Sequence, residues 1–488
     1  MNYLDFFATL LPETTLVLTA LAVLLVDAAG LRELKTANRI LGASLVSLLG
    51  CALSVAFVCM GHGSSYLLDG ILINDPLTRL IKVAILIPGM FTCLLTPGSR
   101  LRAHPGEYFC ILLLAMTGLL LLVSSENLLV IFLSLELASM CLYILAAFNT
   151  TDARSIEAGL KYFLFGGISA AFTLFGFSLI YGLTGSIDLR PIAGALGQST
   201  DPLLMVAVVM VIAGFGFKIA AVPFHLWAPD VYEAAPLSSA AFIASGSKVA
   251  SFYVLARVVI TGLGGTTGVP GSQWMTLLAI LAASSMVLGN LAALTQTSVR
   301  RLLAFSAVAN AGYMLIGVLA PGSGGLPALA YYLILYSITA IGAFGVVALV
   351  EARAGHDRLG AFSGLCRNSP VTAFCLMVFL LSLAGIPPLG GFFAKFYLFA
   401  AALRASPGDP LILSLVVLAI ASSAVSLYYY LRVLKEVYVR PVAGAEPAPI
   451  PDLPVIGLFI LAIAVILLGS FPQWLVHAVE SAQAASSF

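Results

Sequence analysis

Long apolar runs alternate with short polar stretches along the chain. Most runs have roughly the 20 apolar residues that a helix needs to cross a bilayer. They lie at 8–28, 38–60, 77–96, 108–124, 128–148, 158–183, 203–229, 235–259, 272–294, 299–319, 326–350, 371–403, 410–436 and 453–474. The pattern predicts an all-α polytopic membrane protein with about fourteen transmembrane helices.

The polar stretches between the runs are too short to form a soluble domain. The longest are 61–75, 184–202, 351–370 and 440–452. The chain has no G-x-G-x-x-G motif after a strand and no G-x-x-x-x-G-K-[ST] motif, the two common signatures of phosphate-cradling loops. We therefore expect no site for NADH, flavin or ATP in this polypeptide.

Lysine and arginine residues in the loops are strongly biased to one side of the membrane. The rich side holds Arg32, Lys35, Arg39, Arg100, Arg102, Arg154, Arg300, Arg301, Arg353, Arg358, Arg367, Arg432, Lys435 and Arg440. The other side holds Arg190, Arg257 and Arg404. The bias is roughly four to one, and the positive-inside rule then places both termini on the outer side of the membrane, away from the cytoplasm.

The composition agrees with this reading and excludes several others. Hydrophobic residues make up 61% of the 488 residues and charged residues 9%, whereas soluble domains have about 25% charged residues. The net charge of +1 gives no reason to expect nucleic acid as a partner. The seven cysteines form no C-x-x-C pair or Cys/His cluster, so we expect no metal site.

A few charged residues remain inside the apolar runs. A lysine at the bilayer centre costs about 2.5–3.5 kcal/mol on insertion scales, and such residues usually face the protein interior or a water-filled path. Lys218, Lys248, Lys395 and Glu136 fit this description. A purely structural Glu–Lys pair is the alternative. Arg79, Lys82 and Lys161 lie near run ends, where snorkelling to the interface is an equally good explanation.

Two runs combine an intramembrane lysine with helix-breaking residues. Pro223 follows Lys218, and Pro387 with Pro388 precedes Lys395. A proline leaves the carbonyl four residues earlier without its helical partner, so the second break frees the carbonyls of Leu383 and Ala384. Broken backbone at membrane depth is tolerated only inside protein or beside a wet cavity, and it marks ion sites in inverted-repeat transporters.

The two breaks are separated by as many residues as the starts of the runs near 108 and 272. This spacing predicts two five-helix repeats, 108–259 and 272–436, each with one broken helix. Because each repeat has an odd number of helices, the second is inverted relative to the first. Residues 1–107 then supply helices 1–3, and residues 437–488 supply helix 14.

These residues resemble a known family. The segment FKIAAVPFHLWAPDVYEAAP, followed by SGSKVASFYVLAR, is similar to the antiporter-like membrane subunits of respiratory complex I, which are related to subunits of multi-subunit Na⁺/H⁺ antiporters. The likeness runs from roughly 105 to 440. It implies fourteen helices, two inverted repeats and a role in proton translocation.

The resemblance also implies residue roles in the first half of the chain. Glu136 corresponds to the glutamate of helix five, and Lys218 to its lysine partner on helix seven. Glu136 would set the protonation of Lys218 through its charge. Lys161 looks like the additional helix-six lysine near Glu136.

Further along, Lys248 corresponds to the helix-eight lysine and His225 to a bridging histidine. His225 could instead be structural and bond to freed carbonyls. Lys395 corresponds to the helix-twelve residue that faces the exit to the outer side. A lysine there, where the M-type subunit has glutamate, and a chain ending at Phe488 favour the N-type subunit.

By the same resemblance, the chain works with other membrane subunits and carries no cofactor. The quinone, FMN and iron–sulfur clusters would lie in partner subunits of an NADH:quinone oxidoreductase. Three alternatives remain open from the sequence. They are a cation/proton antiporter subunit without a redox partner, a subunit of a membrane hydrogenase or ferredoxin-linked complex, and a structural scaffold.

Overall fold

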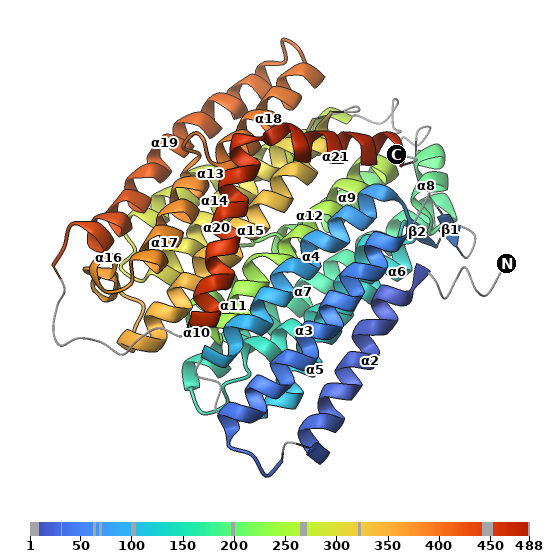
Figure 1. Cartoon of the computed structure of the whole chain (residues 1–488). Coiled ribbons are helices and arrows are strands. Elements are labelled where there is room, and N and C mark those ends of the chain that lie inside the picture. The colour runs from blue at the N-terminus through green and yellow to red at the C-terminus, as the bar shows by residue number, and fades with distance from the viewer. Residues whose placement is uncertain are drawn as a thin grey trace.

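Figure 1 shows a computed structural model of the chain as a bundle of long helices lying side by side. The structure describes residues 9–30, 32–61, 65–67, 71–98, 104–196, 201–263, 271–320, 324–441 and 452–486. Arg100 and Arg102, two of the predicted loop arginines, and Phe488 at the chain end lie outside these residues.

The first helices pack beside the predicted repeats. They are α2 (Leu11–Leu25) with the π-turn η1 (Val26–Gly30), α3 (Thr36–Met60), and α4 (Pro76–Leu95) with the 3₁₀ turn η2 (Thr96–Gly98). A short antiparallel hairpin, β1 (Ser65–Leu67) and β2 (Leu72–Asn74), joins α3 to α4. Asp75 begins α4 because its carboxylate accepts a hydrogen bond from the Thr78 amide at 2.6 Å.

The segment predicted as the first repeat is helical almost throughout. Its elements are α5 (Pro105–Val123), α6 (Leu128–Ala146), α7 (Ala153–Thr184), α8 (Leu189–Leu196), α9 (Pro202–Lys218), α10 (Trp227–Ala234), α11 (Leu237–Ala244), α12 (Gly246–Arg257) and η3 (Val258–Leu263). Asn127, Asp152 and Asp201 cap α6, α7 and α9 through their side-chain oxygens.

The segment predicted as the second repeat and the C-terminal part follow. Their elements are α13 (Gly271–Leu294), α14 (Val299–Val318), α15 (Gly325–Ala354), η4 (Leu359–Phe362), α16 (Leu365–Asn368), α17 (Pro370–Ala384), α18 (Gly390–Ala405), α19 (Pro410–Tyr438), α20 (Asp452–Ser470) and α21 (Pro472–Ala484).

Twelve spans in the described part of the chain are long and apolar enough to cross a membrane. The broken segments α9–α10 and α17–α18 occupy the two remaining predicted runs, so the helices correspond in position to the fourteen runs. α15 lies at the centre of the bundle and is buried along its whole apolar window. Only 33% of the apolar window is buried in each of three helices at the periphery, α2, α7 and α19. Lipid or neighbouring subunits must therefore cover these helices.

The structure corrects three details of the sequence reading. Arg257 was expected in an outer loop, but it is fully buried at the end of α12, 3.7 Å from the Asp75 carboxylate. Acidic and hydroxyl partners on α4 make that burial possible. The run at 235–259 is interrupted at Ser245, between α11 and α12. The amphipathic helices α8 and α21 were not predicted.

Candidate functional site

Lys218 and Glu136 meet where α9 ends against the middle of α6. The Lys218 Nζ donates to Ser139 Oγ at 2.6 Å and to the Tyr143 hydroxyl at 3.1 Å. It lies 3.6 Å from Glu136 Oε1, which is buried and has no hydrogen-bond partner in the described structure. Glu136, Ser139 and Tyr143 share one face of α6 because their spacing is i, i+3 and i+7. That face is a ready-made site for one ammonium group.

The helix break begins directly after Lys218, which is closer to the N-terminus than the position of Pro223 alone predicts. α9 ends at Lys218, Ala220 takes a left-handed backbone conformation (φ 56°), and the Val222–Pro223 peptide is cis. Two side chains satisfy backbone groups in the break. The Val222 amide donates to Ser285 Oγ at 2.9 Å, and the Trp227 indole donates to the Phe217 carbonyl at 3.0 Å.

Lys248 lies in the first turn of α12, just after the interruption at Ser245. Its Nζ donates to the Ala307 carbonyl of α14 at 2.6 Å and lies 5.9 Å from the centre of the Tyr336 ring on α15. The side chain is 1% exposed. Lys248 therefore joins the two predicted repeats, since α12 belongs to one and α14 to the other.

Lys395 is held by the second break. Its Nζ donates to the carbonyls of Leu383 and Ala384 at 2.9 and 3.1 Å and to Ser423 Oγ at 2.7 Å. These are the two carbonyls that Pro387 and Pro388 were expected to free. Three acceptors match the three donors of an ammonium group. Tyr313 covers the same nitrogen from 4.9 Å.

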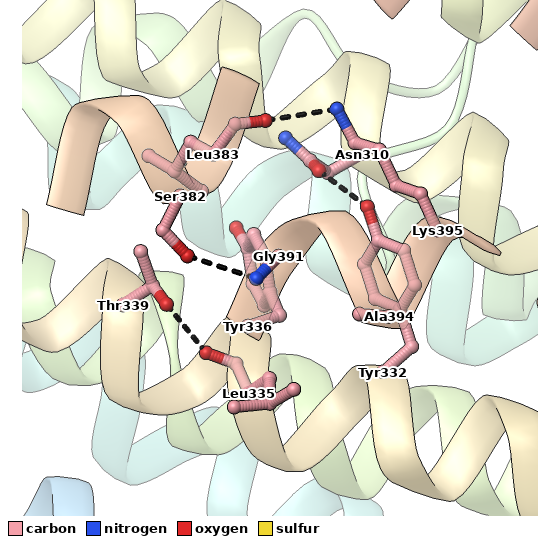
Figure 2. A pocket seen from close by; sticks show the side chains of 10 residues that line it. All are labelled: Asn310, Tyr332, Leu335, Tyr336, Thr339, Ser382, Leu383, Gly391, Ala394 and Lys395. Carbon is pink, nitrogen blue, oxygen red and sulfur yellow. Dashed lines mark hydrogen bonds between the residues drawn. The ribbon is translucent and has the colours of Figure 1, made fainter. Parts of the chain in front are cut away.

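Figure 2 shows a small cavity beside Lys395, and its polar lining was missed in the sequence. The volume is about 10 Å³, close to the least that holds one water molecule. Asn310, Tyr332 and Ser382 line it, and the Tyr332 hydroxyl donates to Asn310 Oδ1 at 2.7 Å. Tyr336 also lines it, and its ring centre lies 5.9 Å from Lys248 Nζ, so this side chain is close to both lysines.

Lys161 forms two ion pairs at the start of α7. Its Nζ lies 2.8 Å from both Glu157 and Asp230, and the side chain is 40% exposed. The guanidinium of Arg301 on α14 lies 2.9 Å from the Asp230 carboxylate and 2.7 Å from the Glu233 carboxylate. Asp230 and Glu233 thus tie α10 to α7 and α14 and do not simply cap α10.

His225 lies within the break of α9–α10, as predicted, but the structure records no bridge to a lysine. Its Nδ1 is buried and has no hydrogen-bond partner among the described residues. The side chain as a whole is partly exposed. A bridging role for His225 therefore stays a prediction.

A polar cleft opens on the arginine-rich face. Its volume is about 1240 Å³, and its lining includes Asp152, Arg154, Glu233, Arg300, Arg301 and Glu351. Arg300 is 5% exposed and donates to the backbone carbonyls of Tyr232 and Ala235. The cleft thus reaches the turn between α10 and α11, close to the residues that follow the first break.

These contacts define what the site can do. Lys218 has an acidic partner, whereas no described carboxylate lies within ion-pair distance of Lys248 or Lys395. Burial disfavours the charged form of an ionisable group, and a nearby opposite charge favours it. A row of lysines in such unequal surroundings can gain and lose protons in turn. No group of three described His, Cys, Asp or Glu residues is placed to hold a metal ion.

Comparison with known proteins decides the family. A family model described as "NADH:quinone oxidoreductase/Mrp antiporter, TM" matches residues 125–421. The chain belongs to this family. The match contains Glu136, Lys218, Lys248 and Lys395, so the buried charges lie in the family's shared core. The resemblance inferred from FKIAAVPFHLWAPDVYEAAP is confirmed, and so is the all-α polytopic fold.

Relatives within the antiporter family cover nearly the whole chain. NADH-quinone oxidoreductase subunit N 2 of Acidobacterium capsulatum is 49% identical over 494 residues, which is 98% of this chain and 99% of that protein. NADH-quinone oxidoreductase subunit N of Desulforamulus reducens is 38% identical over 454 residues, which is 92% of each chain. These names agree with the N-type reading.

Solved structures in the family have the same fold. A chain of respiratory complex I from Thermus thermophilus with bound aureothin matches with a TM-score of 0.79 at 32% identity, covering 96% of this chain and 99% of that one. A chain of the Mrp complex from Dietzia sp. DQ12-45-1b matches with a TM-score of 0.80 at 22% identity, covering 97% of each. At 22% identity, the second match is evidence for the shared fold alone.

Proposed function

We propose that the chain is the proton-translocating N subunit of a bacterial NADH:quinone oxidoreductase. It is a multi-pass subunit of a hetero-oligomeric complex in the cell membrane. Redox chemistry takes place on flavin, iron–sulfur clusters and quinone in partner subunits. The observation that carries the proposal is the row of buried lysines at helix interruptions, together with relatives named subunit N over almost their full length.

In this proposal, Glu136 controls the first proton site. Its carboxylate lies 3.6 Å from Lys218 Nζ, and a change in its surroundings alters how strongly the lysine holds a proton. The neighbouring subunit supplies that change, because α6 faces outward with Leu133 and Met140 about half exposed. Protons enter from the arginine-rich face, where the polar cleft lies.

The later steps use the lysines that have no carboxylate within ion-pair distance. Lys248 passes a proton toward Lys395 through the polar surroundings of Tyr336, Asn310 and Tyr332. His225 and Lys161 assist on the side of the first break. Lys395 releases the proton to the opposite face, and its bonds to the broken helix link that release to backbone movement.

The test is Lys218→Ala in the whole complex. Assembly and NADH oxidation should be retained, while the number of protons pumped per electron falls. Lys435→Ala is the matched control, because Lys435 is an exposed lysine on the arginine-rich face. Normal proton pumping in an assembled Lys218→Ala complex would sink the assignment.

The antiporter alternative needs a separate measurement. We would purify the tagged chain in mild detergent, identify the co-purifying chains by mass spectrometry and assay NADH:quinone reductase activity. Flavin and iron–sulfur subunits with this activity support the proposal. Membrane chains alone, with sodium-dependent proton exchange and no redox activity, would instead indicate a Na⁺/H⁺ antiporter subunit.

A further inference from the structure

A buried ion pair between α2 and α4 lies outside the row of lysines. Lys82 Nζ of α4 donates to Glu13 Oε1 of α2 at 2.7 Å, and the two side chains are 3% and 5% exposed. The Glu13 Oε2 is buried and has no hydrogen-bond partner among the described residues. Snorkelling to the interface, one of the two explanations open for Lys82, is therefore wrong, and Lys82 is an interior charge. Both residues precede the segment that matches the family model.

A polar stripe on α4 leads to this pair. Asp75, Thr78 and Lys82 share one face of α4 because their spacing is i, i+3 and i+7. Two side chains of α12 close over the stripe. The Arg257 guanidinium donates to Thr78 Oγ1 at 3.1 Å and to the Tyr253 hydroxyl at 2.8 Å. That hydroxyl lies 3.3 Å from Thr78 Oγ1.

The stripe continues toward the face where α8 lies. Arg257 Nη1 donates to the Val123 carbonyl at 3.2 Å, at the end of α5. The turn that follows holds Glu126, whose buried carboxylate pairs with Arg190 of α8 at 3.0 Å. The Arg190 side chain is 47% exposed. Polar groups thus lie at intervals between the surface and Glu13, and α12, which carries Lys248, packs against α4 and α5 along this stretch.

We propose that Glu13 and Lys82 form a proton-binding site that exchanges protons with the α8 face. A proton that arrives from the α8 face binds the Glu13 carboxylate, and the Lys82 ammonium keeps its own protons. The net change is one proton added to the pair, held on the Glu13 carboxyl. Release toward the α8 face restores the carboxylate beside the ammonium.

The alternative is an ion pair that only holds α2 against α4. Replacing a buried ion pair with apolar residues is often neutral or stabilising for a fold, so such a pair is weak evidence for a structural role. Ionisable residues inside a membrane protein more often mark proton paths. The unpartnered Glu13 Oε2 also provides a place for the added proton.

The inference rests on the proposed function, and the experiment separates the two. Reconstituted wild-type, Glu13→Gln, Lys218→Ala and Glu13→Leu/Lys82→Met complexes are compared by protons pumped per electron and by redox-induced infrared difference spectra. Both Glu13 variants should lose as much pumping as Lys218→Ala, and Glu13→Gln should remove a carboxyl band. Glu33→Gln, at an exposed carboxylate between α2 and α3 on the other face, is the control.

Each outcome bears on one idea. If Lys218→Ala lowers pumping while both Glu13 variants pump normally and keep the carboxyl band, this inference fails and the proposed function stands. If Lys218→Ala itself pumps normally, the proposed function fails. Should the Glu13 variants not assemble, the wild-type complex is treated with dicyclohexylcarbodiimide, which reacts with protonated carboxyls in apolar surroundings. A Glu13 adduct that increases during turnover supports the site. The absence of any Glu13 adduct overturns it.

Discussion

At the residue scale, the sequence identified single charges better than their partners. Lys218 and Glu136 could be paired only through a family resemblance, because contacts between distant helices leave no local pattern. The Glu13–Lys82 pair was missed for this reason, since its members lie 69 positions apart in different helices. Two of the three acceptors of Lys395 are carbonyls at the fixed offset from the prolines, whereas the third, Ser423 Oγ on α19, has no signal in the sequence.

Glu136→Gln tests the charge of the first pair at nearly constant shape. Removing one partner of a buried pair typically costs about 3–5 kcal/mol, and here Ser139 and Tyr143 still bind Lys218, so the cost is lower. We expect the complex to assemble, with NADH oxidation retained and fewer protons pumped per electron. Proton uptake and NADH oxidation are measured together in vesicles.

Glu33→Gln is the matched control for that variant. Glu33 is exposed between α2 and α3, and exposed charges contribute little, about 0–1 kcal/mol for an ion pair. Its pumping should equal that of the wild type. Equal loss of pumping in both variants would mean that the location of Glu136 beside Lys218 has no special importance.

At the element scale, helix interruptions carry the site, and their predictability depends on proline. The breaks at Pro223 and at Pro387–Pro388 were read from the sequence. The interruption at Ser245 was not, because serine and glycine only weaken a helix whereas proline removes a donor and clashes. The sequence therefore did not predict that Lys248 lies in the first turn of a helix, α12.

Gly391→Ala tests whether the second break depends on close packing. A β-carbon at Gly391 would lie 1.9 Å from the Ser382 carbonyl oxygen, which is backbone and cannot rotate away. Overpacking of this kind typically costs about 1–3 kcal/mol. We expect a lower thermal midpoint of the detergent-solubilised complex and reduced pumping, because α18 carries Lys395.

Gly182→Ala in α7 is the control for this change. Nothing lies within 4 Å of a β-carbon built there. Alanine forms helix more readily than glycine by about 1 kcal/mol, so the thermal midpoint should stay the same or rise. An unchanged midpoint in Gly391→Ala would show that the break has room to move.

At the scale of the whole molecule, the twelve spans of the described chain fall, in order, on twelve of the apolar runs read from the sequence. The inverted relation of the two five-helix units, with boundaries near 108, 259, 272 and 436, stays a prediction. Loop charges are a coarser guide, since Arg257 was counted on the outer side yet lies buried against Asp75. Charge counting cannot tell a loop arginine from one that finds a partner inside the bundle.

The orientation of the chain can be tested with cysteines on the two faces. Gly194 on α8 is exposed with open space around it, and Cys366 on α16 lies near Arg367 on the arginine-rich face. We expect a membrane-impermeant maleimide to label Gly194→Cys in spheroplasts and Cys366 only after permeabilisation. Cys59→Ser removes the other exposed thiol.

The result decides which way the proposed path runs. α21 lies on the face of α8, because Ser486 accepts a hydrogen bond from the Leu77 amide at the start of α4, so one label reports the side of the described C-terminal helix. Labelling of Gly194→Cys from outside places the polar cleft in the cytoplasm and the Arg190 face at the exit. Labelling of Cys366 from outside would reverse the orientation and make the Glu13–Lys82 pair a site of proton uptake.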